Sequence, residues 1–324
     1  MNEKYLEDFC TQKGYQLIDI VTTNKRKDTS ILLVSSQDSG KKFIIKIFGP
    51  NAPGKIKSSF ESEINFYKSY SFNGIPKFFD SGKNFFMLEF FNGNPLPKTI
   101  EQYFFPSNQN SISKFFSNAV PICDWFFNLE TGIHFADNNE KKMITDVLLD
   151  RIGNLITSGP KDTARSNSEA FLLRRFFKNN LKTLETNLAK IVDIWIKDEI
   201  KILSHYGHYD LHCNNFLSTQ NFSEIRLIDF ENIKSPGIWI SDIVYFHATL
   251  YALFSSKKQL QNEIKNHACE YVCRLEPKFD ENQAKKIVDL FCSAADANSR
   301  FRLSNKGIKI SKMREYANSV KNLI

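Results

Sequence analysis

Hydrophobic and polar positions from Tyr15 to Phe91 follow the pattern of a small β-sheet. Short runs of β-branched and aromatic residues are separated by clusters of turn-forming residues, which is typical of strands. The runs predict four strands, at Gln16–Thr23, Ser30–Ser36, Lys42–Phe48 and Phe85–Phe90. We therefore expect an antiparallel sheet in this part of the chain.

One amphipathic helix interrupts these strands. Residues Ser58–Tyr70 place Phe60, Ile64 and Tyr67 on one face, because residues three and four apart are neighbours on a helix surface. Farther along the chain, Asn92–Pro95 is rich in turn formers and predicts a hinge. The first lobe is expected to comprise residues 1–93.

Beyond Pro97 the spacing of apolar residues changes to the helical period of 3.6. It predicts helices at Ile112–Leu129, Glu140–Ile156, Glu169–Ile202, Asp242–Phe254, Lys258–Leu275 and Asn282–Phe301. The polar, turn-rich segment Thr157–Ser168 is expected to form a surface loop. The chain is thus predicted to be an α+β protein whose second lobe, residues 94–324, is mainly helical.

Composition narrows the classes of protein that fit. The 324 residues are 42% hydrophobic, which is enough for two lobes with a core each. No apolar run reaches the roughly 18 to 20 residues of a membrane helix, and the N-terminal segment lacks the layout of a signal peptide, so a cytoplasmic location is expected. The six cysteines form no Cys-x-x-Cys pair and indicate neither a zinc site nor a disulfide framework.

The net charge of +7 favours a polyanionic ligand such as a nucleotide, a phosphorylated sugar or an acidic surface. The charge is spread along the chain rather than gathered in a block, so no nucleic-acid partner is predicted. The 30 phenylalanines are interpreted as core residues.

The segment with the clearest chemistry is His208–Leu217, followed by Ile228–Glu231. It places Asp210 five residues before Asn215, and Asp229 at the end of an apolar strand. Phosphoryl transfer uses such a set: one carboxylate orients the attacking hydroxyl and accepts its proton, while an amide oxygen and a second carboxylate hold Mg²⁺. The alternative is a loop with ordinary capping residues.

The same segment resembles a known family. HYDLHCNNFL with LIDFE is similar to the HGDLHxxNxL and IDFE signatures of aminoglycoside phosphotransferases and choline-kinase-like enzymes, which belong to the protein-kinase-like superfamily. Ordinary protein kinases fit less well, because they carry Arg before the aspartate, Lys two residues after it, and DFG. The family usually has Gly where this chain has Tyr209, a change that would narrow the site near the attacking group.

The resemblance implies a bilobal kinase-like fold that binds ATP and Mg²⁺. It implies a lysine on the third strand that clamps the phosphates, and Lys46 occupies that place. The alternative is an edge-strand lysine that faces solvent. Its partner is expected on the following helix, where Glu63 is preferred over Glu61 because it lies beside the apolar face.

Further nucleotide contacts are implied by the same resemblance. The carbonyl of Glu89 and the amide of Phe91 are expected to bond adenine. The hairpin between the first two strands has no glycine, and its cations Lys25–Lys27 either meet phosphate oxygens or lie in water. His212 is expected to contact the γ-phosphate or, alternatively, to bond the neighbouring loop.

Two residues are predicted to support the loop rather than to react. His208 is expected to pack its side chain against the core of its lobe, and Asp242 to brace the loop through backbone hydrogen bonds. Either Ser241 or Asp242 is also a plausible N-cap for the helix that follows.

The function implied is that of an ATP-dependent phosphotransferase that moves the γ-phosphoryl group to a hydroxyl of a sugar, aminosugar or amino alcohol. Asp210, Asn215 and Asp229 would be the catalytic residues, and the last two would hold Mg²⁺. Two alternatives keep the fold: a kinase for an envelope glycan or a protein, and a nucleotide-binding pseudokinase that acts as a scaffold. About a dozen residues separate Asp229 from Asp242, which is short for a peptide-docking loop.

Overall fold

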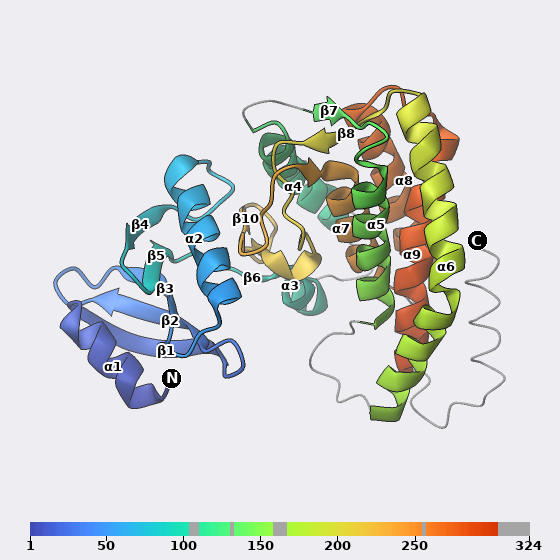
Figure 1. The fold of residues 1–324 in the computed structure, drawn as a ribbon. Coiled ribbons are helices and arrows are strands. Elements are labelled where there is room, and N and C mark those ends of the chain that lie inside the picture. The colour runs from blue at the N-terminus through green and yellow to red at the C-terminus, as the bar shows by residue number, and fades with distance from the viewer. Residues whose placement is uncertain (104–109, 130–132, 158–166, 255–256, 304–324) are drawn as a thin grey trace. The chain divides into compact units, whose positions relative to one another are not determined.

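The computed structural model describes residues 1–103, 110–129, 133–157, 167–254 and 257–303. The chain divides into two compact units, which are described separately (Figure 1). Residues 1–125 and 214–233 form the first, called the sheet unit, and residues 126–213 and 234 onward form the second, called the helical unit. Residues 94–125, assigned to the second lobe from the sequence, cluster with the sheet unit.

The sheet unit is built on a five-stranded antiparallel sheet in the order β1-β2-β3-β5-β4. Its strands are β1 (Tyr15–Asn24), β2 (Thr29–Ser36), β3 (Lys42–Phe48), β4 (Phe78–Ser81) and β5 (Phe85–Glu89). The four predicted strands correspond to β1, β2, β3 and β5. Alternation of apolar and polar residues identifies strands because successive side chains point to opposite faces of the sheet. The edge strand β4 is short and was not predicted.

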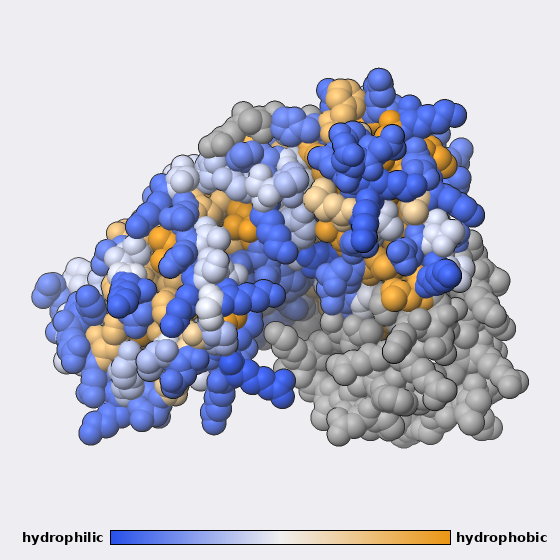
Figure 2. All heavy atoms as spheres, in the orientation of Figure 1, coloured by the Kyte–Doolittle hydropathy of each residue, from blue (hydrophilic) through white to orange (hydrophobic). Residues whose placement is uncertain are grey.

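Helix α1 (Glu3–Gln12) covers one face of this sheet. It begins at Asn2, whose side chain accepts a hydrogen bond from the Tyr5 amide at 2.9 Å. Leu6 and Cys10 of α1 are buried against strand residues such as Ile45. Hydrophilic side chains cover most of the visible surface of the sheet unit, with smaller hydrophobic areas between them (Figure 2).

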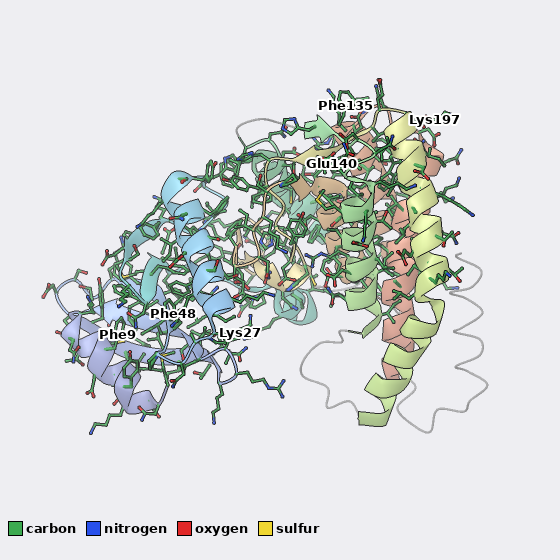
Figure 3. All side chains as sticks on the ribbon, in the orientation of Figure 1. Phe9, Lys27, Phe48, Phe135, Glu140 and Lys197 are labelled. Atoms are coloured by element: carbon green, nitrogen blue, oxygen red, sulfur yellow. The ribbon has the colours of Figure 1, made fainter. Side chains whose placement is uncertain are left out.

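Helix α2 (Gly54–Ser69) packs on the opposite face, where aromatic rings fill the interface. Phe60 of α2 lies edge-on to Phe48, with ring centroids 4.8 Å apart, and at the same distance from Phe86 of β5. Phe9 of α1 and Phe48 at the end of β3 thus mark the two faces of the sheet (Figure 3).

The remaining elements of the sheet unit are a second, three-stranded sheet in the order β10-β9-β6 and three helical segments. They are β6 (Asn94–Pro95), α3 (Leu96–Tyr103), α4 (Asn110–Phe127), the short 3-10 helix η1 (Cys213–Asn215), β9 (Phe216–Ser218) and β10 (Ile225–Leu227). Both α4 and η1 span a boundary between the units. The strands β9 and β10 lie between the two motif segments Asp210–Asn215 and Asp229–Glu231, so this hairpin connects them.

The helical unit holds five helices and a three-stranded sheet in the order β11-β8-β7 among its described residues. Its elements are β7 (Ile133–Phe135), α5 (Lys141–Thr157), α6 (Asn167–Lys197), β8 (Lys201–Ser204), β11 (Gly237–Ile238), α7 (Trp239–Leu253), α8 (Lys258–Leu275) and α9 (Glu281–Leu303). Helix α7 is buried over nearly its whole length and contacts α5, α8 and α9. It forms the centre of this unit.

Three helix boundaries differ from the prediction by three residues or more. Helix α2, predicted from Ser58, begins at Gly54. The helix expected to run to Ile202 ends at Lys197, because Glu199 adopts a positive φ of 51° and the chain then pairs as β8. Helix α7 begins at Trp239 and has no side-chain cap, so the proposal of Ser241 or Asp242 as its N-cap is wrong. The loop predicted at Thr157–Ser168 falls mostly on residues 158–166, outside the described residues.

None of the helices in the described part of the chain is both long enough and apolar enough to cross a membrane.

Candidate functional site

Lys46 lies on the central strand of the five-stranded sheet. Phe43, Ile45 and Ile47 of β3 are buried toward α1, so Lys46, one position out of step, points to the face that α2 covers. Its side chain is 13% exposed. The alternative of an edge-strand lysine facing solvent is therefore wrong, because β3 pairs with a strand on each side.

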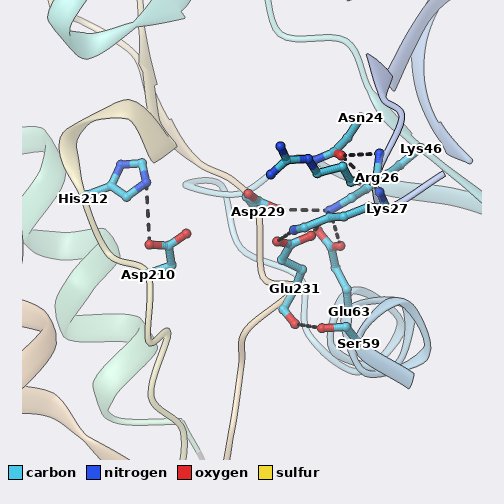
Figure 4. Close-up of polar contacts among 10 residues, drawn as sticks. All are labelled: Asn24, Arg26, Lys27, Lys46, Ser59, Glu63, Asp210, His212, Asp229 and Glu231. Carbon is cyan, nitrogen blue, oxygen red and sulfur yellow. Dashed lines mark hydrogen bonds and ion pairs between the residues drawn. The ribbon is translucent and has the colours of Figure 1, made fainter. Parts of the chain in front are cut away.

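Lys46 is surrounded by carboxylates (Figure 4). Its Nζ donates to Glu63 Oε2 at 2.6 Å and to Asp229 Oδ1 at 2.9 Å, and it lies 3.6 Å from Glu231 Oε2. Of the two glutamates considered for this helix, Glu63 makes the pair and is buried, whereas Glu61 is exposed. The structure thus brings together the lysine, the helix glutamate and the second motif aspartate.

The charges of this cluster depend on one another. Burial alone would lower the pKa of Lys46, but Glu63, Asp229 and Glu231 outweigh it and raise the pKa above its ordinary value. Burial raises the pKa of Glu63 to about 7 against the opposing effect of Lys46. Lys46 therefore stays protonated, and its charge is what favours the ionised form of Glu63.

Asp229 is held in place by its chain neighbours on both sides. The Ile228 amide donates to the Asn215 carbonyl at 2.9 Å, which ties the two parts of the motif together. Phe230 stacks on Phe66 of α2, with ring centroids 4.3 Å apart, and lies edge-on to Tyr67. Phe230 is fully buried, so α2 positions both Glu63 and the segment that carries Asp229.

Asn215 and Asp229 provide the kind of ligands that Mg²⁺ prefers. An amide oxygen and a carboxylate are hard oxygen donors, and Mg²⁺ usually takes one or two carboxylates and completes its shell with water and substrate phosphates. Asn215 is buried in η1, and the Asp229 side chain is 34% exposed, so its carboxylate can reach a ligand. Among the described residues, no group of three or more His, Cys, Asp or Glu side chains could hold a metal ion.

The hairpin without glycine also reaches this cluster. Lys27, in the turn between β1 and β2, donates to Glu231 Oε1 at 2.7 Å, and Ser59 of α2 donates to the Glu231 carbonyl (Figure 4). Glu231 is the last residue of the LIDFE segment, and the sequence alone assigns it no role. Nothing in the local pattern indicates its partners, because Lys27 lies 204 positions earlier in the chain.

The predicted adenine contacts lie at the end of the sheet. Glu89 is the last residue of β5, and its amide donates to the Lys77 carbonyl at 2.8 Å. Phe91 follows, with the Arg226 guanidinium 5.0 Å from the centre of its ring. Both positions are in the sheet unit with Lys46, and their nucleotide contacts remain predictions.

The first motif segment is divided after Cys213, and its residues 208–213 belong to the helical unit. Asp210 and His212 have side chains that are 30% and 22% exposed, and His212 Nε2 is 3.7 Å from Asp210 Oδ1. Protonation of His212 would make this contact an ion pair. This contact is longer than a hydrogen bond, so both alternatives for His212 remain predictions.

Asp242 of α7 fixes the backbone beside Asp210. Its Oδ2 accepts from the His208 amide at 2.7 Å and its Oδ1 from the Tyr209 amide at 3.0 Å, so the predicted bracing role is confirmed. Burial raises the pKa of Asp242 to about 6, while Arg151 and the two amides lower it. The His208 side chain is fully buried and lies against Phe126, as expected.

Tyr209 has the left-handed backbone conformation, with φ at 54°. Glycine adopts this conformation without a steric cost, which explains why the family signature has Gly here. The tyrosine ring has its own contacts: its hydroxyl donates to the Pro236 carbonyl at 2.9 Å, and the Lys234 ammonium lies 5.1 Å from the ring centre. The ring packs so closely on Gly207 that a Cβ there would lie 2.6 Å from Cε2.

Arg151 of α5 was not identified from the sequence. Its guanidinium lies 5.7 Å from the ring centre of Tyr209 and 5.3 Å from that of Tyr245, and the residue is 7% exposed. It is a buried positive charge that stabilises the Asp242 carboxylate. Its position in the middle of an ordinary helical pattern gives no sequence signal.

Comparison with known proteins supports the fold. No protein-family model and no curated protein sequence matches the chain. Among solved structures, the ethanolamine kinase of Plasmodium vivax aligns with a TM-score of 0.53 and 15% identity, covering 99% of this chain and 88% of that chain. A choline kinase of Cryptosporidium parvum Iowa II has a TM-score of 0.48 and 12% identity, covering 99% and 94%. The gentamicin complex of APH(2")-IIa aligns with a TM-score of 0.47 and 13% identity, covering 100% of this chain and 96% of that chain.

The likeness to the ethanolamine kinase extends over nearly the whole chain. Together with the antiparallel sheet and the helical C-terminal region, it confirms the α+β kinase-like fold that the motif resemblance predicted.

Proposed function

We propose that this chain is an ATP-dependent phosphotransferase that transfers the γ-phosphoryl group to a hydroxyl of a small molecule. The observation that carries the proposal is the largely buried Lys46, whose Nζ lies 2.6 Å from Glu63 and 2.9 Å from Asp229 in a kinase-like fold. A lysine is expensive to bury unless anions surround it, so its placement here favours an anion-binding role. The second motif aspartate is already next to it.

The candidate site residues of the sheet unit all take part in nucleotide binding in this proposal. Lys46, oriented by Glu63, binds the α and β phosphates, while the carbonyl of Glu89 and the amide of Phe91 bond the adenine edge. Asn215 and Asp229 are the ligands for Mg²⁺, which when bound offsets the charge of the phosphates. With Lys46 fixed by two carboxylates, little side-chain freedom is lost when the nucleotide binds.

Asp210 is the base in this proposal. It orients the acceptor hydroxyl and accepts its proton as the phosphoryl group transfers. Asp242, with its two backbone hydrogen bonds to His208 and Tyr209, keeps the loop in one conformation, so that Asp210 is positioned before the acceptor arrives. His212, whose Nε2 is 3.7 Å from Asp210 Oδ1, is assigned to the γ-phosphate in this proposal.

The motif resemblance, together with the fold that this chain shares with an ethanolamine kinase, supports a hydroxyl of a small molecule as the acceptor. Sugars, aminosugars and amino alcohols are the candidates. A thermal-shift screen of these compounds, with Mg²⁺ and a non-hydrolysable ATP analogue, would identify the acceptor, because a ligand that binds only the folded state raises the melting temperature.

The decisive experiment compares three aspartate-to-asparagine variants in an assay of Mg²⁺-dependent ATP consumption with the acceptor identified. We expect Asp210→Asn to lower kcat by roughly 10²–10⁴-fold, the usual contribution of a general base. Asp229→Asn should lower it by at least about 10²-fold through the loss of a charged ligand and of the contact with Lys46. Asp38→Asn, an exposed aspartate between β2 and β3, should have no effect. Near wild-type turnover in either of the first two would disprove the mechanism.

A further inference from the structure

One carboxylate joins two lysines in the sheet unit. Glu231 places Oε1 at 2.7 Å from the Nζ of Lys27 and Oε2 at 3.6 Å from the Nζ of Lys46. The two ammonium groups come from different elements, the β1–β2 turn and strand β3. They are therefore close enough for a single anionic group to contact both (Figure 4).

The β1–β2 turn is held in shape by polar contacts instead of glycines. Asn24 Oδ1 accepts from the amides of Arg26 and Lys27, each at 3.1 Å. On the other side of Lys27, the Asp28 carboxylate accepts from the Asn51 amide at 3.1 Å, and its carbonyl accepts from the Gly49 amide at 2.7 Å. Lys27 is thus presented by a turn that is fixed at both ends.

Lys27 differs from its neighbours in the turn. Lys25 and Arg26 are exposed, whereas the Lys27 side chain is 42% exposed and directed at Glu231 (Figure 4). A surface ion pair of this kind contributes little to stability, typically below about 1 kcal/mol. Glu231 can therefore release Lys27 at little cost when a stronger anion competes for it.

A triphosphate is such an anion. It presents several charged oxygens, and charge-assisted hydrogen bonds to phosphate are among the strongest that lysine makes. Lys46 already shares its charge among Glu63, Asp229 and Glu231, so a second cation is needed to balance an incoming triphosphate. Lys27 is the cation that the geometry supplies.

We propose that Lys27 is a phosphate-binding residue of the nucleotide site, held by Glu231 until the terminal phosphates of a nucleoside triphosphate replace that carboxylate as its partner. The proposal rests on the nucleotide binding proposed above. In it, the lysine of a rigid turn takes over the contact with phosphate that backbone amides make in a glycine-rich loop.

The test is isothermal titration calorimetry with Mg²⁺ and three ligands that differ in phosphate number: a non-hydrolysable ATP analogue, ADP and AMP. We expect Lys27→Met to lower the affinity for the ATP analogue by about tenfold, since one charge-assisted hydrogen bond is lost. The affinity for ADP should fall less, and the affinity for AMP should not change. Lys27→Arg should restore binding of the ATP analogue, and Lys25→Met, the matched control in the same turn, should leave all three affinities unchanged.

Removing the carboxylate tests the other half of the proposal. Glu231→Gln keeps the size of the side chain but attracts Lys27 less, so the ATP analogue should bind severalfold more tightly, whereas AMP should bind as in the wild type. Weaker binding of the ATP analogue with AMP unchanged would show that Glu231 is not the partner that phosphate replaces.

The outcomes separate this inference from the proposed function. If the wild type does not bind the ATP analogue, both fail. If Lys46→Met abolishes binding while Lys27→Met leaves it unchanged, or if Lys27→Met weakens AMP as much as the ATP analogue, only the role of Lys27 is disproved.

Discussion

Tyr209 combines an unfavourable backbone conformation with favourable side-chain contacts. A residue other than glycine in the left-handed region costs about 1 kcal/mol or more. The ring offsets this cost through the hydrogen bond to the Pro236 carbonyl and its contacts with the cations of Arg151 and Lys234. The large side chain is thus part of the structure that supports Asp210.

Substitutions at this position should separate the two effects. We expect Tyr209→Ala to be the least stable variant, because it keeps the positive φ and loses the ring. Tyr209→Gly should be about 1 kcal/mol more stable than Tyr209→Ala, since it relieves the backbone. Tyr209→Phe should cost about 1 kcal/mol relative to the wild type, the usual value of one hydrogen bond. Urea denaturation gives these free energies, and an alanine variant as stable as the glycine variant would contradict the assignment of backbone strain.

At the scale of elements, α7 and α8 are joined by a histidine pair, in which His247 is buried and His267 is half-buried. His247 Nε2 lies 2.9 Å from His267 Nδ1, and His247 Nδ1 lies 2.8 Å from the Ile243 carbonyl. Burial lowers the pKa of His247 to about 3, with a smaller effect from His267, and lowers that of His267 to about 4, with a smaller effect from Arg274. Both rings are therefore neutral in the folded protein.

The histidine pair should make the protein sensitive to acid. Below the ordinary histidine pKa of 6.5 the unfolded chain takes up protons that the folded chain cannot, so the stability present above pH 6.5 is lost as the pH falls toward about 4. At about pH 4 the free energy of unfolding is lower by about 3 kcal/mol per histidine, because each pKa unit corresponds to 1.36 kcal/mol.

The double variant His247→Gln/His267→Gln is the control, because it removes both titrating rings and leaves the carboxylates with raised pKa, Glu63 and Asp242, in place. Its free energy of unfolding in urea, measured between pH 4.5 and 7.5, should depend less steeply on pH than that of the wild type. Parallel curves would exclude a neutral buried pair.

At the scale of the whole molecule, nucleotide binding should appear as added stability. A ligand that binds only the folded state at 100 times its Kd adds about 2.7 kcal/mol to the free energy of unfolding. We expect a non-hydrolysable ATP analogue to raise Tm in the presence of Mg²⁺, and to raise it less when Mg²⁺ is removed by chelation. Lys46→Met should abolish the rise, whereas Lys83→Met, on the exposed turn before β5, should not. An unchanged rise in Lys46→Met would place the nucleotide elsewhere.

The longer elements of the fold and the candidate residues of the motif could be identified from the sequence because they leave local signals. Alternation with a period of two identified β1, β2, β3 and β5, and the 3.6 period identified α2 and α4 to α9, with the end of α6 placed too late. The spacing of Asp210, Asn215 and Asp229 is also local, since these residues lie in two short segments joined by one β-hairpin. Short elements such as β4 and β8 were missed because a few residues do not establish a period.

Only the tertiary structure decided the contacts between residues that are far apart in the chain. The choice of Glu63 over Glu61 depends on which face of α2 packs on the sheet. The pairing of Lys27 with Glu231 and the place of Arg151 beside Tyr209 depend on how separate elements pack. The sequence by itself determined the longer periodic elements and the spacing of the motif residues, because both depend on residues that are near one another in the chain. The partners of each charge were decided by packing, which no local pattern records.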